Sequence, residues 1–167
     1  MTNLGAKQVD KLKIIKAYKK MFDGPPSLQQ PALICSESVA KSGLIIEWLR
    51  ALGLDVYFGS HFKDILETAN TSAIKYSIVY VDIESQDGIK NIIDDLIAFR
   101  KSFPTIPLVI ISPLSNYNDL SSERLPICDI SMRSIYHMSQ LERVTDTAIE
   151  NNALWQKRHE TMFQSKT

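Results

Sequence analysis

The sequence predicts an α/β protein in which a doubly wound, five-stranded parallel sheet lies between two layers of helices. Two observations predict this three-layer fold class. From residue 32 onward, short apolar segments of strand length alternate with longer segments whose apolar residues recur at helical spacing. The connections between them are short, so strands joined through a helix make right-handed crossovers and lie parallel.

The expected strands are apolar along most of their length. Continuous apolar character is typical of strands that are covered by helices on both faces, and it is clearest in the first, third and fourth strands. The fifth strand is less apolar than the others. The strands are expected at residues 32–35, 55–58, 77–81, 108–111 and 127–132.

Each expected helix has a start signal or an apolar face. Ser38 and Ser60 are predicted caps of the first two helices of this region, and Ser139 with Glu142 has the spacing of a capping box. Residues 116–124 are polar and have weak helical character. The helices are expected within residues 38–53, 60–69, 89–103 and 139–162. The first should bury Leu44, Ile45, Trp48, Leu49 and Leu52 and end at Gly53.

Composition excludes several classes of protein. The 167 residues include 19 basic and 19 acidic side chains, and 44% are hydrophobic, which argues against disorder and against a protein that coats nucleic acid. The apolar runs are too short to cross a bilayer, and no secretory signal is evident. Cys35 and Cys128 lack CxxC spacing. We therefore expect a cytoplasmic protein with reduced thiols.

The first 31 residues differ in charge from the remainder. Residues 6–22 have the apolar spacing of an amphipathic helix with six lysines, and residues 24–31 read as a linker. Residues 1–31 have a net charge of +4, whereas residues 32–167, with 13 basic and 17 acidic side chains, have −4. We predict an arm, 1–31, and a domain, 32–167. The arm could bind anionic lipid, nucleic acid or a partner helix, but we favour docking on the domain or on a second copy in a homodimer.

Polar side chains follow four of the expected strands. They are Ser36 and Glu37, then Asp82, Ser112 and Arg133. Because the carboxyl ends of parallel strands meet at one edge of a sheet, these residues should converge. Carboxylates suit Mg²⁺, and a hydroxyl or guanidinium suits a phosphoryl oxygen. The alternative is that they are ordinary polar residues where strands reach solvent.

In this order, the residues from 32 to about 159 resemble the receiver domain of bacterial two-component response regulators. The resemblance implies a flavodoxin-like sheet of order 2-1-3-4-5. It also implies that Asp82 is the phosphoacceptor, that Ser112 is the hydroxyl ending strand four, and that Glu37 is one of two acids after strand one. Glu37 and Asp82 would then hold Mg²⁺.

The sequence departs from the receiver pattern at several of these positions. Ser36 replaces the first acid, which removes a charge and an oxygen ligand from the metal site. Arg133 and Ser134 replace the usual Lys and Pro, and a guanidinium does not reproduce the geometry of an ammonium. Ile130 stands where many receivers have an aromatic residue. The loop after Asp82 lacks the usual Pro and looks shorter.

These departures lead to the main functional prediction. We expect a stand-alone, atypical receiver-like domain, a pseudo-receiver, that acts by binding a protein: a histidine kinase, a phosphotransfer protein or a downstream regulator. In the family, helix four, strand five and helix five commonly carry dimerisation and output. The resemblance therefore places the interaction face at Ile130, Met132 and Tyr136.

Two alternatives remain open. The first is a working receiver in which Asp82 accepts a phosphoryl group with the help of Mg²⁺. The second is a small flavodoxin-like enzyme or nucleotide binder, but the sequence has no GxGxxG, GxxxxGK[ST] or GxSxG motif and its three histidines are scattered. An enzyme is therefore not expected, nor is nucleic-acid binding or stable membrane insertion.

Overall fold

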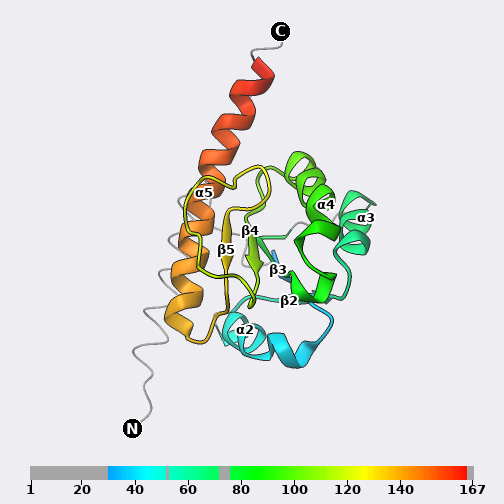
Figure 1. Cartoon of the computed structure of the whole chain (residues 1–167), viewed down its shortest axis with the longest axis vertical. Coiled ribbons are helices and arrows are strands. Elements are labelled where there is room, and N and C mark those ends of the chain that lie inside the picture. Colours follow the sequence, from blue (N-terminus) through cyan, green and yellow to red (C-terminus); the bar gives the residue numbers. More distant parts are fainter. Residues whose placement is uncertain (1–29, 52, 72–75, 165–167) are drawn as a thin grey trace.

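A computed structural model describes residues 30–51, 53–71 and 76–164, which form one parallel sheet with helices on both faces (Figure 1). The strand order is β2-β1-β3-β4-β5, as the sequence predicted. The strands are β1 Ala32–Cys35, β2 Val56–Gly59, β3 Ile78–Asp82, β4 Leu108–Ile111 and β5 Ile130–Met132. The helices are α2 Val39–Ala51, α3 Phe62–Thr71, α4 Ile89–Ser102 and α5 Met138–Gln164, with a short 3₁₀ helix, η1, at Glu84–Gln86. The predicted helix at 6–22 and Leu52 lie outside the described residues.

The register of the central strands decides which residues meet at the carboxyl edge. Cys35 of β1 pairs with Val81 of β3, and Asp82 pairs with Ile111 of β4. The residues that immediately follow these strands therefore leave the sheet side by side. This is the edge at which an open parallel sheet presents ligand-binding residues.

Alternate residues of each buried strand contribute to two separate cores. On one face, Val79 and Val81 lie under α3 and α4, where Phe62 and Phe99 pack with ring centroids 5.6 Å apart. On the other face, Tyr80 lies under α2 and α5. Each large apolar side chain buried in this way contributes about 1.5–3 kcal/mol. The sheet thus separates two hydrophobic layers, as its continuous apolar strands predicted.

Helix α2 buries most of the face that was expected, since Ile45 and Leu49 are buried and Trp48 packs against the core, but Leu44 does not belong to that face. Ile46 is buried beside Ile45 and Leu49, whereas Leu44 is 53% exposed. Ile45, Ile46 and Leu49 follow the i, i+1, i+4 spacing of one helical stripe, and Leu44 falls outside it. The predicted end of the helix is correct, because Gly53 adopts a φ of 82° and its N–H donates to the carbonyl of Arg50.

The predicted helix caps are wrong at α3 and α5. Helix α3 begins at Phe62, and its first N–H donates to Oε1 of Gln86, not to Ser60. Helix α5 begins at Met138, before the expected capping box. There Oε1 of Gln140 accepts hydrogen bonds from the backbone N–H groups of Tyr136 and His137. At the start of each helix, a glutamine side-chain oxygen accepts the backbone hydrogen bond that a serine was expected to accept. Gln86 does so at α3 and Gln140 does so at α5.

The connection between β4 and β5 contains no helix. Residues 112–129 run instead through turns, and Asp119 forms an antiparallel bridge with Ser131 on the outer edge of β5. Strand β5 is shorter than predicted because Ile127 and Cys128 belong to a turn in which their N–H groups donate to the carbonyl of Arg124. This irregular segment therefore covers an edge strand that would otherwise present unpaired backbone groups.

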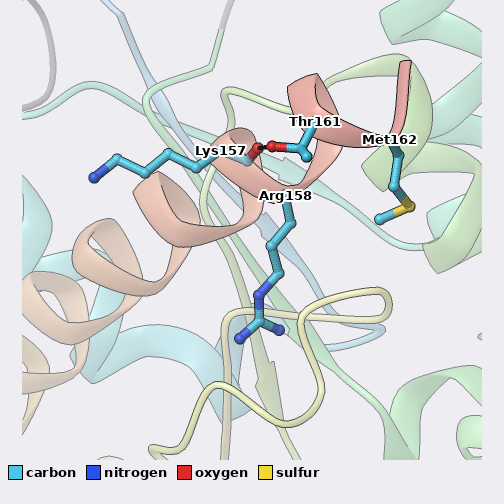
Figure 2. Close-up of a pocket in the computed structure, with 4 residues that line it drawn as sticks. All are labelled: Lys157, Arg158, Thr161 and Met162. Atoms are coloured by element: carbon cyan, nitrogen blue, oxygen red, sulfur yellow. Dashed lines mark hydrogen bonds between the residues drawn. The ribbon is translucent and has the colours of Figure 1, made fainter. Parts of the chain in front are cut away.

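Helix α5 extends well past the sheet. Its last turns project beyond the other elements (Figure 1), and most side chains from Lys157 onward are exposed. This projecting end has a shallow pocket of about 400 Å³. Its lining residues are Lys157, Arg158, Thr161 and Met162 (Figure 2). All four residues belong to one helix, so the pocket is a surface hollow without converging elements. None of the described helices is long and apolar enough to span a membrane.

Candidate functional site at the carboxyl edge of the sheet

The half-buried carboxylate of Asp82 lies at the end of β3, with hydrogen bonds to both of its oxygens. Oδ2 accepts from the hydroxyl of Ser36 at 3.1 Å and from the hydroxyl of Ser85 at 2.5 Å. Oδ1 accepts from the backbone N–H of Glu84 at 3.2 Å. The chain itself therefore solvates this carboxylate.

Ser36 is fully buried at the end of β1. The strand register places it next to Asp82, because Cys35 and Val81 are paired. The Oγ of Ser36 also accepts a hydrogen bond from the backbone N–H of Ser38, with the two atoms 3.4 Å apart. The prediction that residues 36 and 82 converge is therefore confirmed for this pair of side chains, with a hydroxyl in the place of a carboxylate.

Each side chain of η1 contacts a different loop at this edge. Glu84 accepts a hydrogen bond from the hydroxyl of Ser112 at 2.9 Å, and Ser85 bonds to Asp82. Gln86 is buried and bridges to the β2–α3 loop, donating to the carbonyl of Ser60 and accepting from the N–H of Phe62. Three consecutive residues thus tie together the ends of three strands, β2, β3 and β4. Sequence reasoning missed all three, because they lie two to four residues beyond the end of β3, in a short 3₁₀ helix.

The backbone after η1 reverses direction through two residues with positive φ. Asp87 has a φ of 56° and Gly88 has a φ of 89° with a ψ of 167°. The conformation of Gly88 is one that side chains avoid, so glycine is required there. This reversal starts α4 immediately after η1 and keeps the loop short. A run of polar residues ending in glycine was the available signal in the sequence.

Electrostatics at the edge follow from burial. The thiol of Cys35, next to Ser36, has its pKa raised to about 12, first by burial and then by the negative charge of Asp82. The thiol is therefore protonated at neutral pH and donates weakly to the carbonyl of Ser60 at 3.8 Å. It acts as part of the core and not as a nucleophile.

Two of the predicted site residues do not join this network. Glu37 and Arg133 are both exposed. The backbone N–H of Arg133 donates to Oδ1 of Asn118 at 2.9 Å, but its guanidinium makes no ion pair with any described residue. A predicted convergence of two carboxylates, a hydroxyl and a cation thus becomes a cluster of hydroxyls around Asp82.

The residues at this edge do not fit a Mg²⁺ site of the expected kind. Mg²⁺ prefers carboxylates and waters in octahedral geometry. Within the described ranges, no group of three or more Asp, Glu, His or Cys side chains is placed to hold a metal ion. Ser36 donates its hydrogen to Asp82, which orients the hydroxyl as a partner of the carboxylate and not as a fellow ligand. The oxygens of Asp82 are satisfied by the protein.

A groove of about 470 Å³ opens beside the hydroxyl cluster. Its apolar lining includes Ile83, Ile110 and Leu114, with Glu84 and Arg124 as charged residues. It lies between the start of α4 and the irregular β4–β5 segment. Glu84 lines the groove and also accepts a hydrogen bond from Ser112, so the groove and the hydrogen-bond network share this residue.

Neither a protein-family model nor a curated protein sequence matches the chain. Solved structures do resemble it. The receiver domain of the Francisella response regulator 1452 matches with a TM-score of 0.52 at 19% identity, over 73% of this chain and 98% of that one. The chain has the receiver-domain fold.

Two further structures share this receiver fold. NtrX from Brucella abortus, solved in complex with ADP, matches with a TM-score of 0.57 at 19% identity over 83% of this chain and 30% of that protein. A sensor protein from Polaromonas sp. JS666 matches with a TM-score of 0.54 at 19% identity, over 74% of this chain and 98% of that one. This chain therefore corresponds to about a third of the length of NtrX.

The receiver fold is altered on the face where the resemblance placed partner contacts. The family's fourth helix has no counterpart, because residues 112–129 are irregular. Ile130 and Met132 are only 1% and 4% exposed. Their side chains point into the core beneath α5, beside Leu141, so neither lies on an interaction face. Tyr136, at 68% exposure, does lie on the surface.

Proposed function

We propose that the chain is a signalling domain with the receiver fold that acts by binding a protein partner, and that its carboxyl-edge pocket is held by its own hydroxyl groups instead of Mg²⁺ and a phosphoryl group. The proposal rests on the observation that both carboxylate oxygens of Asp82 accept hydrogen bonds from the chain. A metal or phosphoryl group would have to compete with those donors. A domain with this arrangement needs no covalent modification to order its edge.

The surface offers a place for such a partner. The groove beside Glu84 is apolar within and charged at its rim, and Leu114 at its wall is 80% exposed. Exposed apolar residues around a groove favour protein contact. We place the partner there, keep the exposed Tyr136 of the β5–α5 loop as a further candidate contact, and expect the partner to be a kinase, a phosphotransfer protein or a downstream regulator acting in the cytoplasm. No catalytic activity of the chain's own is proposed.

A second candidate is a working phosphoacceptor. Asp82 ends β3 and remains half-exposed, as an attacking carboxylate must. In that case Mg²⁺ would need new ligands, and the hydroxyl of Ser36 would have to turn away from Asp82. The protein's own hydrogen bonds oppose this rearrangement, which is why we favour the first proposal.

Mg²⁺ titration followed by calorimetry or by amide NMR shifts tests the proposal. We expect no saturable binding at the carboxyl edge in the millimolar range. Ser36→Asp restores an acid beside Asp82 and should bind Mg²⁺ more tightly than the natural chain, whereas Ser36→Ala should not. Saturable millimolar binding by the natural chain that Asp82→Asn removes would overturn the proposal.

A further inference from the structure

The hydroxyl of Ser112 is already bound to an anion of the protein. Its Oγ lies 2.9 Å from Oε1 of Glu84, and both residues are half-buried. A serine hydroxyl has a single hydrogen to donate. While Glu84 accepts that hydrogen, Ser112 has none for another anion at this edge.

The other hydroxyl groups of the edge are committed in the same way. The hydroxyl of Ser36 lies within hydrogen-bond distance of Asp82, of Ser85 and of the carbonyl of Ser38, and the hydroxyl of Ser85 donates to Asp82. Within the described part of the chain, neither Asp82 nor Glu84 forms an ion pair. Hydroxyls and one backbone N–H are therefore the donors that stabilise two negative charges in a confined space. A third anion would meet repulsion from both carboxylates and would find no free hydroxyl.

We infer that Glu84 is a built-in anion: its carboxylate occupies the place at Ser112 that an external phosphoryl-like group would need, and so holds this edge in one arrangement without modification. The inference rests on the proposed function and deepens it. Glu84 is then the group that excludes the phosphoryl oxygen. The serine at position 36, where receivers have an acid, explains only why the metal site is weak.

The bond to Ser112 also positions the groove. The N–H of Ser112 donates to the carbonyl of Met132 at 2.6 Å, and the N–H of Ser115 donates to the carbonyl of Ser112 at 3.0 Å. Leu114 lies within this turn and lines the groove. Glu84 thereby fixes both the hydroxyl and the wall on which we place the partner. Its role is one of positioning.

Amide hydrogen exchange of Ser115 tests this role. Glu84→Ala should increase the exchange rate about fivefold to tenfold, the effect of losing one hydrogen bond of ordinary net strength at a half-exposed site. Glu84→Gln, which keeps an oxygen acceptor without the charge, should give a smaller increase. Asp87→Asn is the matched control, because it removes a charge from the same loop and asparagine tolerates the positive φ of 56°. Unchanged exchange in Glu84→Ala would overturn the inference.

A second measurement tests exclusion of the anion. In a Ser36→Asp background, beryllofluoride with Mg²⁺ serves as the phosphoryl-like probe, and binding is followed by NMR shifts of residues 82–85. Adding Glu84→Ala should tighten binding about tenfold, because a competing acceptor and a like charge leave the edge. Adding Asp87→Asn should change binding less than about twofold. Equal affinity with and without Glu84 would contradict the inference.

The two proposals can fail separately. Mg²⁺ binding by the natural chain would overturn the proposed function whatever Glu84 does. An unchanged amide exchange rate at Ser115 after Glu84→Ala would overturn the role of Glu84. It would not affect the proposal that hydroxyl groups of the chain hold Asp82. If neither the Ser36→Asp variant nor the double variant with Glu84→Ala binds beryllofluoride, the claim that Glu84 excludes the anion is wrong.

Discussion

Arg100 and Asp129 form a completely buried ion pair, with Nη2 and Oδ1 2.7 Å apart, at the end of the sheet opposite Asp82. A second guanidinium nitrogen lies 2.8 Å from Oδ2 of the same carboxylate. Asp129 also accepts from the N–H of Leu108, at the start of β4, and the guanidinium lies over the ring of Trp155. This cluster joins α4, α5 and the segment that precedes β5.

Asp129→Ala should lower the free energy of unfolding by about 3–5 kcal/mol, because it leaves the guanidinium of Arg100 buried without its partner. Denaturant unfolding measures the loss. Replacing both residues by leucine should recover much of it, since no buried charge then remains. The partly exposed pair of Arg124 and Asp119, whose side chains are 44% and 12% exposed, is the control, and Arg124→Ala should cost no more than about 1 kcal/mol. A similar small loss for Asp129→Ala would contradict this account.

Asn151 should hold the irregular β4–β5 segment in place. From the buried face of α5, its Nδ2 donates to the carbonyls of Leu120, Ser121 and Asp129. Asn151→Ala should cost about 1–3 kcal/mol, because it removes the donor that reaches the buried carbonyl of Asp129 and two less buried carbonyls. Hydrogen exchange should rise across residues 119–131. Thr147→Ala, at an exposed position on the same helix, should stay within about 0.5 kcal/mol, and equal losses at both sites would refute the assignment.

The two cysteines should be unreactive in the folded protein. Burial raises the pKa of both Cys35 and Cys128 to about 12, so almost no thiolate exists at pH 8. Ellman's reagent should label neither cysteine in the native protein and both in urea. Because their pKa is higher in the folded than in the unfolded chain, their contribution to stability is complete below about pH 8.5 and falls as the pH rises towards 12. Rapid native labelling at pH 8 would show that the thiols are accessible.

The arm at residues 1–31, which is almost entirely outside the described part of the chain, remains a prediction from the sequence. Its apolar stripe and six lysines favour docking on the acidic domain or on a second copy. If it joins two copies, deletion of residues 1–24 should reduce the mass measured by light scattering to that of one chain. The same number of subunits before and after deletion would exclude a role in dimerisation.

The strands were predictable because burial on both faces leaves a strong local signal. Four consecutive apolar residues at Leu108–Ile111 are typical of a strand that is buried on both faces. Positions at strand ends were predictable for the same reason, and Ser36, Asp82 and Ser112 do lie at one edge.

The hydrogen-bond network of the edge was harder to predict, because its partners are distant in sequence. Nothing local to Glu84 indicates that it accepts from Ser112, 28 residues away. The buried Arg100 was missed for a similar reason: an arginine in the last turn of a helix usually reaches solvent, and only its pairing with Asp129 allows complete burial. Residues such as Ile130 were misplaced by family resemblance, since the irregular segment and α5 together bury the strand that carries it.

The central claim is that the protein's own hydroxyl groups hold Asp82 and that no phosphoryl transfer is needed. Incubation with Mg²⁺ and a small phosphodonor such as acetyl phosphate, followed by intact-mass measurement, tests it most directly. We predict that the mass of the natural chain does not change. A gain of one phosphoryl group that Asp82→Asn abolishes would contradict the account and establish the chain as a working phosphoacceptor.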